Sequence, residues 1–175
     1  MHNLINWFQQ SLLVPDFIRA HMLRLLGYSI DKKARIASGV FLGSRNFQMG
    51  PRSFINVNCF LDGCSRIELG EYVHLGPHVK ILTGTHTYDH SVLRRAGSST
   101  DIFKPVIIKR GCWVGMGAII LPGVVLEEGC IIGAGAVVTR STQANGLYLG
   151  NPAKRVRDLP EGTDPQVTGA LVTDA

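Results

Sequence analysis

Four histidines in the middle of the chain, His74, His78, His86 and His90, are the residues best suited to move protons near neutral pH. His86 ends the tetrapeptide TGTH, at the point where a regular pattern in the sequence breaks off. An imidazole placed there can act as a general base that takes the proton from a hydroxyl group. The rival base is His90, and Asp89 could orient either ring.

Other chemistry-bearing residues are less specific. The four cysteines form no CxxC pair and no zinc-like cluster, so free thiols in a reducing cytoplasm are the simplest interpretation. No Ser or Cys nucleophile motif is present. Near the end of the chain, Lys154, Arg155 and Arg157 follow the tetrapeptide GNPA, and their cationic groups suit phosphates.

The net charge of +5 agrees with a polyanionic ligand, which could be a nucleotide cofactor, a nucleic acid or an acidic membrane surface. Aromatic residues make up only 7% of the chain, and no motif that reads RNA or DNA is present. We therefore expect no nucleic-acid partner.

A six-residue repeat must position these groups. Every sixth residue from Ile108 to Val138 is aliphatic, and the residue four places further on is small or medium in size. This period describes a short strand followed by a corner, so that three hexads return the chain to its start, about 4.8 Å higher. The N-terminal half carries the same pattern with register slips, and we expect glycines where the chain turns tightly, at Gly43, Gly70, Gly76, Gly115 and Gly133.

The repeat divides the chain into three regions. Residues 1–33 show helical periodicity, residues 34–145 carry the repeat with an inserted loop at 86–104, and residues 146–175 form a C-terminal extension. An insertion into an otherwise regular coil favours a functional role. The amphipathic N-terminal region is expected to cap the open end of the solenoid, with weak peripheral membrane association as the alternative. Neither a signal peptide nor an 18-residue apolar stretch is evident.

The hexads and the segments ILTGTHTYD, CWVGMGAIILPGVVL, IIGAGAVVTR and GNPAKRVR resemble the hexapeptide-repeat acetyltransferases, over roughly residues 25–158. The similar branch contains the maltose, galactoside and colanic-acid-type sugar O-acetyltransferases. The resemblance implies an all-β fold, a left-handed parallel β-helix with short N-terminal helices. It also implies a cytoplasmic homotrimer with active sites between subunits, which moves acetyl from acetyl-CoA to a sugar or polysaccharide hydroxyl, with no metal.

On the acceptor side, the resemblance assigns three substrate contacts and the base. His86 matches the family's general base, which acts without a covalent acyl-enzyme. Asn56 and Asp62 lie in the segment FINVNCFLD, which resembles the acceptor-binding segment, and Trp113 resembles an aromatic residue of the acceptor or pantetheine pocket. The alternatives are a corner residue that satisfies its own backbone for Asn56 and Asp62, and subunit packing for Trp113.

On the donor side, the resemblance assigns a coenzyme A cleft. Backbone N–H groups around Gly115, Met116 and Gly117 could stabilise the oxyanion of acyl transfer. Further cofactor contacts match family positions along the pantetheine arm and the nucleotide: Ala134, Thr139, Arg140, Lys154 and Arg157.

Three alternative functions stay open at this point. A metal enzyme similar to the γ-class carbonic anhydrases would use His74, His78 and His86, although their spacing does not reproduce that family's pattern. An acetyltransferase of the same kind could act on the amino group of an amino sugar or antibiotic. A β-helix without catalytic activity could serve as an assembly subunit.

Overall fold

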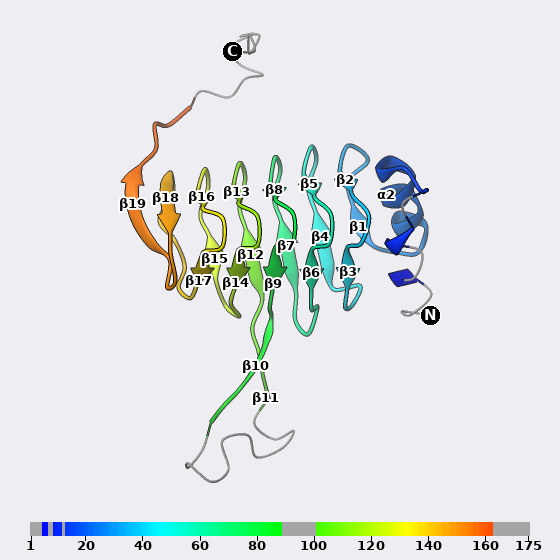
Figure 1. Ribbon diagram of the computed structural model, residues 1–175. Coiled ribbons are helices and arrows are strands. Elements are labelled where there is room, and N and C mark those ends of the chain that lie inside the picture. The colour runs from blue at the N-terminus through cyan, green and yellow to red at the C-terminus, as the bar shows by residue number, and fades with distance from the viewer. Residues whose placement is uncertain (1–4, 7–8, 12, 89–100, 163–175) are drawn as a thin grey trace.

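The computed structural model describes residues 5–6, 9–11, 13–88 and 101–162. Most of these residues form a three-walled solenoid, in which each turn contributes one short strand to each of three parallel sheets (Figure 1). The strands are only two to three residues long in most turns because a corner follows each of them. The predicted all-β parallel β-helix with a short N-terminal helix is confirmed.

The walls are named A, B and C in the order in which the chain visits them. Wall A contains β1 (Ser29–Ile30), β4 (Phe47–Met49), β7 (Ile67–Leu69), β12 (Val106–Ile108) and β15 (Val125–Leu126). Wall B contains β2 (Arg35–Ile36), β5 (Phe54–Ile55), β8 (His74–Leu75), β13 (Trp113–Val114), β16 (Ile131–Ile132), β18 (Gly146–Leu149) and β19 (Lys154–Asp158). Wall C contains β3 (Phe41–Leu42), β6 (Phe60–Leu61), β9 (Lys80–Ile81), β14 (Ile119–Ile120) and β17 (Val137–Val138).

Two antiparallel pairs interrupt this parallel pattern. The inserted loop leaves as β10 (Gly84–His86) and returns as β11 (Asp101–Phe103), and the pair projects away from the prism (Figure 1). At the C-terminal end, β18 and β19 pair antiparallel. The division at residues 33 and 145 stays a prediction; the structure places β1 before the first of these positions and β18 after the second.

The core is the column of aliphatic side chains inside the prism. The inward residues of the regular turns are almost completely buried, with Ile108, Val114 and Ile120 at 0% exposure. Cys59, Cys112 and Cys130 also point inward and are at most 1% exposed, as expected from their small position in the hexad. Stacking one turn on the next therefore buries a continuous apolar ladder, which no single turn could form alone.

The glycine after the aliphatic position was expected to allow a tight turn, but the structure shows that it allows close contact between successive coils. A Cβ atom at Gly43 would lie 1.7 Å from the carbonyl oxygen of Asp62 on the next turn, so the two coils approach too closely for any side chain. The tight-turn explanation is therefore wrong for Gly43. Positive φ is found instead at other corner positions, such as Gly117 with φ 67°.

The N-terminal segment covers the open end of the first turn, as the sequence predicted. Asn6 exchanges hydrogen bonds with the backbone of Leu42, at 3.2 and 3.5 Å, and the Gly39 N–H donates to the carbonyl of Gln9 at 2.7 Å. The helix α2 (Asp16–Leu25) follows, and its buried Arg19 donates to three carbonyls of the preceding segment. These contacts satisfy the strand edge that the first coil would otherwise expose.

In the part of the chain that the structure describes, none of the helices has the length and hydrophobicity needed to cross a bilayer.

Candidate active site

His86 is positioned by the hairpin that leaves wall C. After β9 the chain does not turn into wall A but continues outward, and β10 pairs with β11 so that Gly84 lies opposite Phe103 and His86 opposite Asp101. The hairpin register therefore brings together two polar residues that are fifteen positions apart in the sequence.

Asp101 is the carboxylate partner of His86. The Nδ1 atom of His86 lies 2.6 Å from Oδ1 of Asp101, an ion-pair distance, although the two atoms do not have hydrogen-bond geometry; this ring nitrogen is buried, while the side chain as a whole is 36% exposed. A carboxylate beside Nδ1 favours the tautomer that carries its proton there, which leaves the lone pair of Nε2 free to accept one. The expected rival His90 and its neighbour Asp89 lie outside the described residues.

Sequence reasoning did not find Asp101. The only feature of the sequence that marks Asp101 is its position where the insertion returns to the solenoid. This position points to His86 only if the first and last residues of the insertion are assumed to pair as one hairpin. Pairing TGTH with the residues before Pro105 would then have set Asp101 against His86.

Asp62 anchors the base of the same hairpin. Its carboxylate accepts hydrogen bonds from the backbone N–H groups of Thr83 at 2.8 Å, Gly84 at 3.1 Å and Cys64 at 3.2 Å, and from the Thr83 hydroxyl. Thr83 is completely buried, and its Oγ1 accepts in turn from the Ser65 N–H at 2.8 Å. The Asp62 carboxylate is thus committed to positioning the start of β10, whereas its predicted contact with substrate stays a prediction.

The other predicted acceptor residues lie on wall B and its corner. Asn56 is half-buried, and its Oδ1 accepts from the Val57 N–H at 2.8 Å, which is the backbone-satisfying role foreseen as its alternative. Trp113 is 56% exposed on the outer face of wall B, between His74 and Ile131. Since His86 projects beyond wall C, one chain does not bring Trp113 and His86 onto the same wall.

The corner between walls B and C carries the predicted donor-side residues. The Gly115 N–H donates to the carbonyl of Ile132 at 2.7 Å, and the Gly117 N–H to that of Pro77 at 2.8 Å, so neither is available for an oxyanion. The Met116 N–H, by contrast, has no acceptor among the described residues. The predicted oxyanion site therefore narrows from three backbone donors to one.

Glycines bring the backbones of successive turns together at this corner. A Cβ atom at Gly115 would lie 2.6 Å from the backbone nitrogen of Ala134, so the turns are in direct backbone contact here. Above it, the Val137 N–H donates to the carbonyl of Gly150 and the Ala153 N–H to that of Val137, at 3.0 and 2.8 Å. Residues 150–153 therefore extend wall C and lie close to the predicted cofactor residues that follow β17, Thr139 and Arg140.

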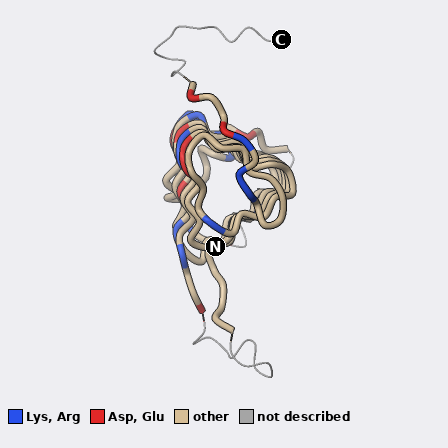
Figure 2. The backbone as a smooth tube through the Cα atoms, turned by 90° about the vertical axis from the view of Figure 1, so that its left-hand side faces the viewer, with Lys and Arg blue, Asp and Glu red and all other residues tan. Residues whose placement is uncertain are grey.

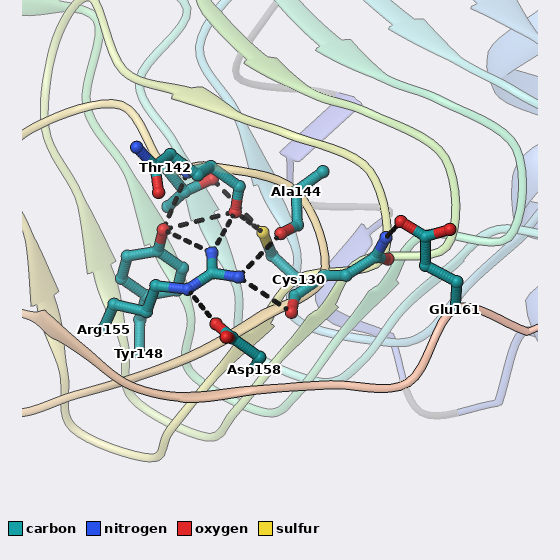
Figure 3. Close-up of polar contacts among 9 residues, drawn as sticks. Cys130, Thr142, Ala144, Tyr148, Arg155, Asp158 and Glu161 are labelled. Atoms are coloured by element: carbon teal, nitrogen blue, oxygen red, sulfur yellow. Dashed lines mark hydrogen bonds and ion pairs between the residues drawn. The ribbon is translucent and has the colours of Figure 1, made fainter.

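The basic residues of the C-terminal strand separate into two groups. Lys154 and Arg157 are exposed on β19, as a phosphate contact would require. Arg155 instead donates to the carbonyls of Gln143, Ala144 and Asn145, to Asp158 at 2.7 Å and to the Tyr148 hydroxyl at 3.2 Å (Figure 3). The Arg155 guanidinium is thus committed to holding the last strand on the solenoid, whereas its predicted contact with cofactor phosphates stays a prediction.

The three histidines of the metal alternative do not converge. His74 lies on the outer face of wall B with its ring edge-on to Phe54, His78 occupies a corner with φ 59°, and His86 is on the hairpin. Among the residues that the structure describes, no three His, Cys, Asp or Glu side chains gather in a geometry that could hold a metal ion.

Comparison with known proteins finds the hexapeptide repeat and several acetyltransferase relatives. Residues 105–140 match the family model for the bacterial transferase hexapeptide (six repeats). The chain is 36% identical to the galactoside O-acetyltransferase of Lactococcus lactis over 158 residues, which cover 89% of this chain and 75% of that protein. Other curated relatives align over only 54% to 59% of their own length, so the chain spans a little more than half of those proteins.

Solved structures resemble the solenoid over most of its length. The maltose O-acetyltransferase of Clostridium difficile is 29% identical and superposes with a TM-score of 0.73 over 91% of this chain and 85% of that one. A hexapeptide-repeat acetyltransferase of Vibrio cholerae, complexed with acetyl coenzyme A, has a TM-score of 0.72 over 91% and 86% of the two chains. Because the two sequences are only 21% identical, this similarity shows a shared fold and nothing about function.

Proposed function

The chain belongs to the hexapeptide-repeat acetyltransferase family, and from this premise we propose that it transfers acetyl from acetyl-CoA to a hydroxyl group of a sugar or polysaccharide precursor. The observation that carries the proposal is the contact of 2.6 Å between His86 Nδ1 and Asp101 Oδ1. A histidine that is oriented by a carboxylate, on a loop that leaves the regular scaffold, is equipped for proton transfer and has no evident role in the core.

His86 acts as the general base in this proposal. Asp101 holds the proton on Nδ1, and Nε2 takes the proton of the acceptor hydroxyl. The hydroxyl oxygen forms a bond to the thioester carbonyl carbon while the carbon–sulfur bond breaks, and the proton passes from Nε2 to the departing thiolate. The Met116 N–H, which has no acceptor among the described residues, donates to the carbonyl oxygen as negative charge develops on it.

The corner between walls B and C fits the acetyl-CoA arm. Gly76 and Gly115 carry no side chains, and a Cβ atom at either would lie less than 3 Å from the backbone of the next turn, so a slender chain would lie beside the backbone here, next to the exposed Met116 side chain. The exposed cations Arg140, Lys154 and Arg157 at the C-terminal end would hold the phosphates, and Thr139 would lie beside them. Acetyl-CoA supplies the activated acetyl group, and the chain supplies orientation and the base.

The proposed enzyme is a homotrimer with active sites between subunits. Acidic residues lie mainly along one side and the top of the tube, whereas basic residues occur on both sides (Figure 2). Wall A carries the ion pairs Arg66–Glu68 at 2.6 Å and Lys109–Glu127 at 2.7 Å. The outer face of wall C instead carries the stacked rings of Phe41 and Phe60, each 38% exposed, and wall B carries Trp113. Packing one copy's hairpin against its neighbour's wall B would bring His86 to Trp113, which a single chain does not do.

We place the enzyme in the cytoplasm, in the synthesis of a polysaccharide. All four cysteines are free thiols, in agreement with a reducing compartment where acetyl-CoA is present. Asn56 would contact the acceptor through its Nδ2 group, because its Oδ1 is already bonded to Val57.

The test is release of free coenzyme A thiol in a panel of mono- and oligosaccharides, amino sugars included. We expect turnover with a neutral sugar, and a loss of about 100- to 10,000-fold in kcat for His86→Ala at an unchanged melting temperature. The matched control is His74→Ala, an exposed histidine of wall B that the mechanism does not use as a base. Full turnover in a folded His86→Ala variant would rule out the mechanism, and acetylation confined to amino groups would replace the O-acetyl assignment.

A further inference from the structure

The N-terminal segment has two faces, and the capping role explains only the inner one. Its inner face contacts the first turn through Asn6, Gln9 and the buried residues Ala20 and Leu23. The outer face exposes four large apolar side chains, Leu13 at 92%, Phe17 at 63%, Ile18 at 39% and Leu25 at 74%, with the exposed His21 between Phe17 and Leu25. Phe17 and Leu25 are eight residues apart on α2, so both lie on the same side of the helix.

Positive charge is concentrated at the same end of the molecule. The first fifty residues contain six Lys and Arg but only two Asp, so they carry a net charge of +4 out of the +5 of the whole chain. One of the two acids, Asp16, is neutralised by Arg35 in an ion pair of 2.5 Å.

These cations surround the C-terminal half of α2. Arg24 donates to the carbonyl of Asp31 at 3.2 Å, which places the exposed turn at Lys32 and Lys33 beside the helix. Arg45 lies near the end of the helix, since a Cβ atom at Gly27 would be 3.9 Å from its Nη1. The exposed Leu25 is therefore flanked by basic groups.

We propose that this end of the solenoid docks on an anionic lipid surface, with Leu13, Phe17, Ile18 and Leu25 entering the interface and the surrounding cations contacting headgroups. An exposed apolar stripe within a ring of Lys and Arg is the arrangement by which amphipathic helices bind membranes without crossing them. A second copy of the chain is the less suitable occupant, because its equivalent face carries the same positive charge and would be repelled.

The geometry allows docking without blocking the proposed active site. Helix α2 lies at one extreme of the solenoid, whereas β10 and β11 project sideways from its middle (Figure 1). The solenoid would then bind the membrane through its N-terminal end, and the hairpin would be free to contact glycan acceptors assembled at that surface. This placement goes beyond the acetyl transfer proposed above and does not depend on it.

The experiment is co-sedimentation of the full chain with vesicles of phosphatidylcholine alone or with 30% phosphatidylglycerol. We expect binding to the anionic vesicles at least about tenfold stronger than to neutral ones, and weakened by 0.5 M salt. The double variant Phe17→Ser/Leu25→Ser and the variant Lys32→Ala/Lys33→Ala should each lose about fivefold or more. The matched control is Val156→Ser, an apolar residue of 54% exposure on β19 at the opposite end, which should bind as the wild type does.

Each possible outcome decides the proposal. Absence of vesicle binding by the wild type at low salt would overturn it, as would equal binding by the wild type and by both the serine and the lysine variants. If the serine pair lowers the oligomer mass in sedimentation equilibrium while lipid binding is absent, the face is a contact between copies and the proposal is wrong. Turnover with a soluble acceptor is measured in parallel, so failure of lipid binding is distinguishable from failure of acetyl transfer.

Discussion

The regular turns and the β10–β11 hairpin are built on opposite principles. In the turns, each inward side chain stacks on its equivalent in the next coil, and Leu75, Val114 and Ile132 are at most 1% exposed. In the hairpin, no residue is fully buried, and its two strands pair only with each other. The difference separates a scaffold that is stabilised by repetition from an inserted hairpin that carries the candidate base.

The largest effect is expected from the interior of a regular turn. Leu126 is 0% exposed, so Leu126→Ala should lower the free energy of unfolding by about 2–5 kcal/mol, measured by urea denaturation. The neighbouring Val125 points outward on wall A, and Val125→Ala should cost less than about 1 kcal/mol. Similar losses for the two variants would contradict the separation into a buried and an outer face.

The hairpin should respond in turnover and not in stability. Asp101→Asn removes the charge beside His86 Nδ1, so kcat should fall at least about tenfold while KM for acetyl-CoA and the melting temperature stay the same. Asp101→Glu should restore part of the activity, because a carboxylate is again available. Glu68→Gln, which alters an ion-paired carboxylate of wall A, is the control. Wild-type turnover in Asp101→Asn would show that Asp101 does not orient the base.

Asp62 joins the two regions, so its variant should affect both. Asp62→Asn leaves one acceptor oxygen where the carboxylate now bonds Thr83, Gly84 and Cys64, and we expect a loss of stability of about 1–2 kcal/mol. Amide hydrogen exchange at residues 83–86 should accelerate, and kcat should fall several-fold. A rise in KM for the acceptor alone, with unchanged exchange, would instead support the substrate contact that the sequence predicted.

The smallest expected effect concerns pH and the core. Burial raises the pKa of the Cys59 thiol to about 11, from about 9 in the unfolded chain. The folded state thus favours the protonated thiol, and this contribution is complete below pH 9 and is lost as the pH rises towards 11. Between pH 7 and pH 10 the stability advantage of the wild type over Cys59→Ala should shrink by about 1 kcal/mol, with Val79→Ala, a buried residue that does not titrate, as control. A stability difference between the wild type and Cys59→Ala that stays constant from pH 7 to pH 10 would contradict a neutral buried thiol.

The sequence predicted the repeating part of the molecule well because the signal there is periodic. A six-residue alternation of aliphatic and small residues leaves few folds that can bury it, so the walls, the inward cysteines and the outward Trp113 followed directly. The TGTH segment pointed to His86 as the candidate base, because the period stops there, and its catalytic role stays a prediction. Charge and motif did not reveal that the Arg155 guanidinium is already bonded inside its own chain, and its contact with phosphates stays a prediction.

By itself the sequence determined the solenoid, its core positions and the candidate base, since these depend on local spacing that each turn repeats. Only the tertiary structure decided that Asp101 partners His86, that Asp62 anchors the hairpin and that the Met116 N–H finds no acceptor within the described part of the chain. These pairings join residues on different strands or turns, and their register depends on how far the inserted loop extends before it returns. No spacing along the chain encodes that length, so contacts across the insertion become visible only when the coils are stacked.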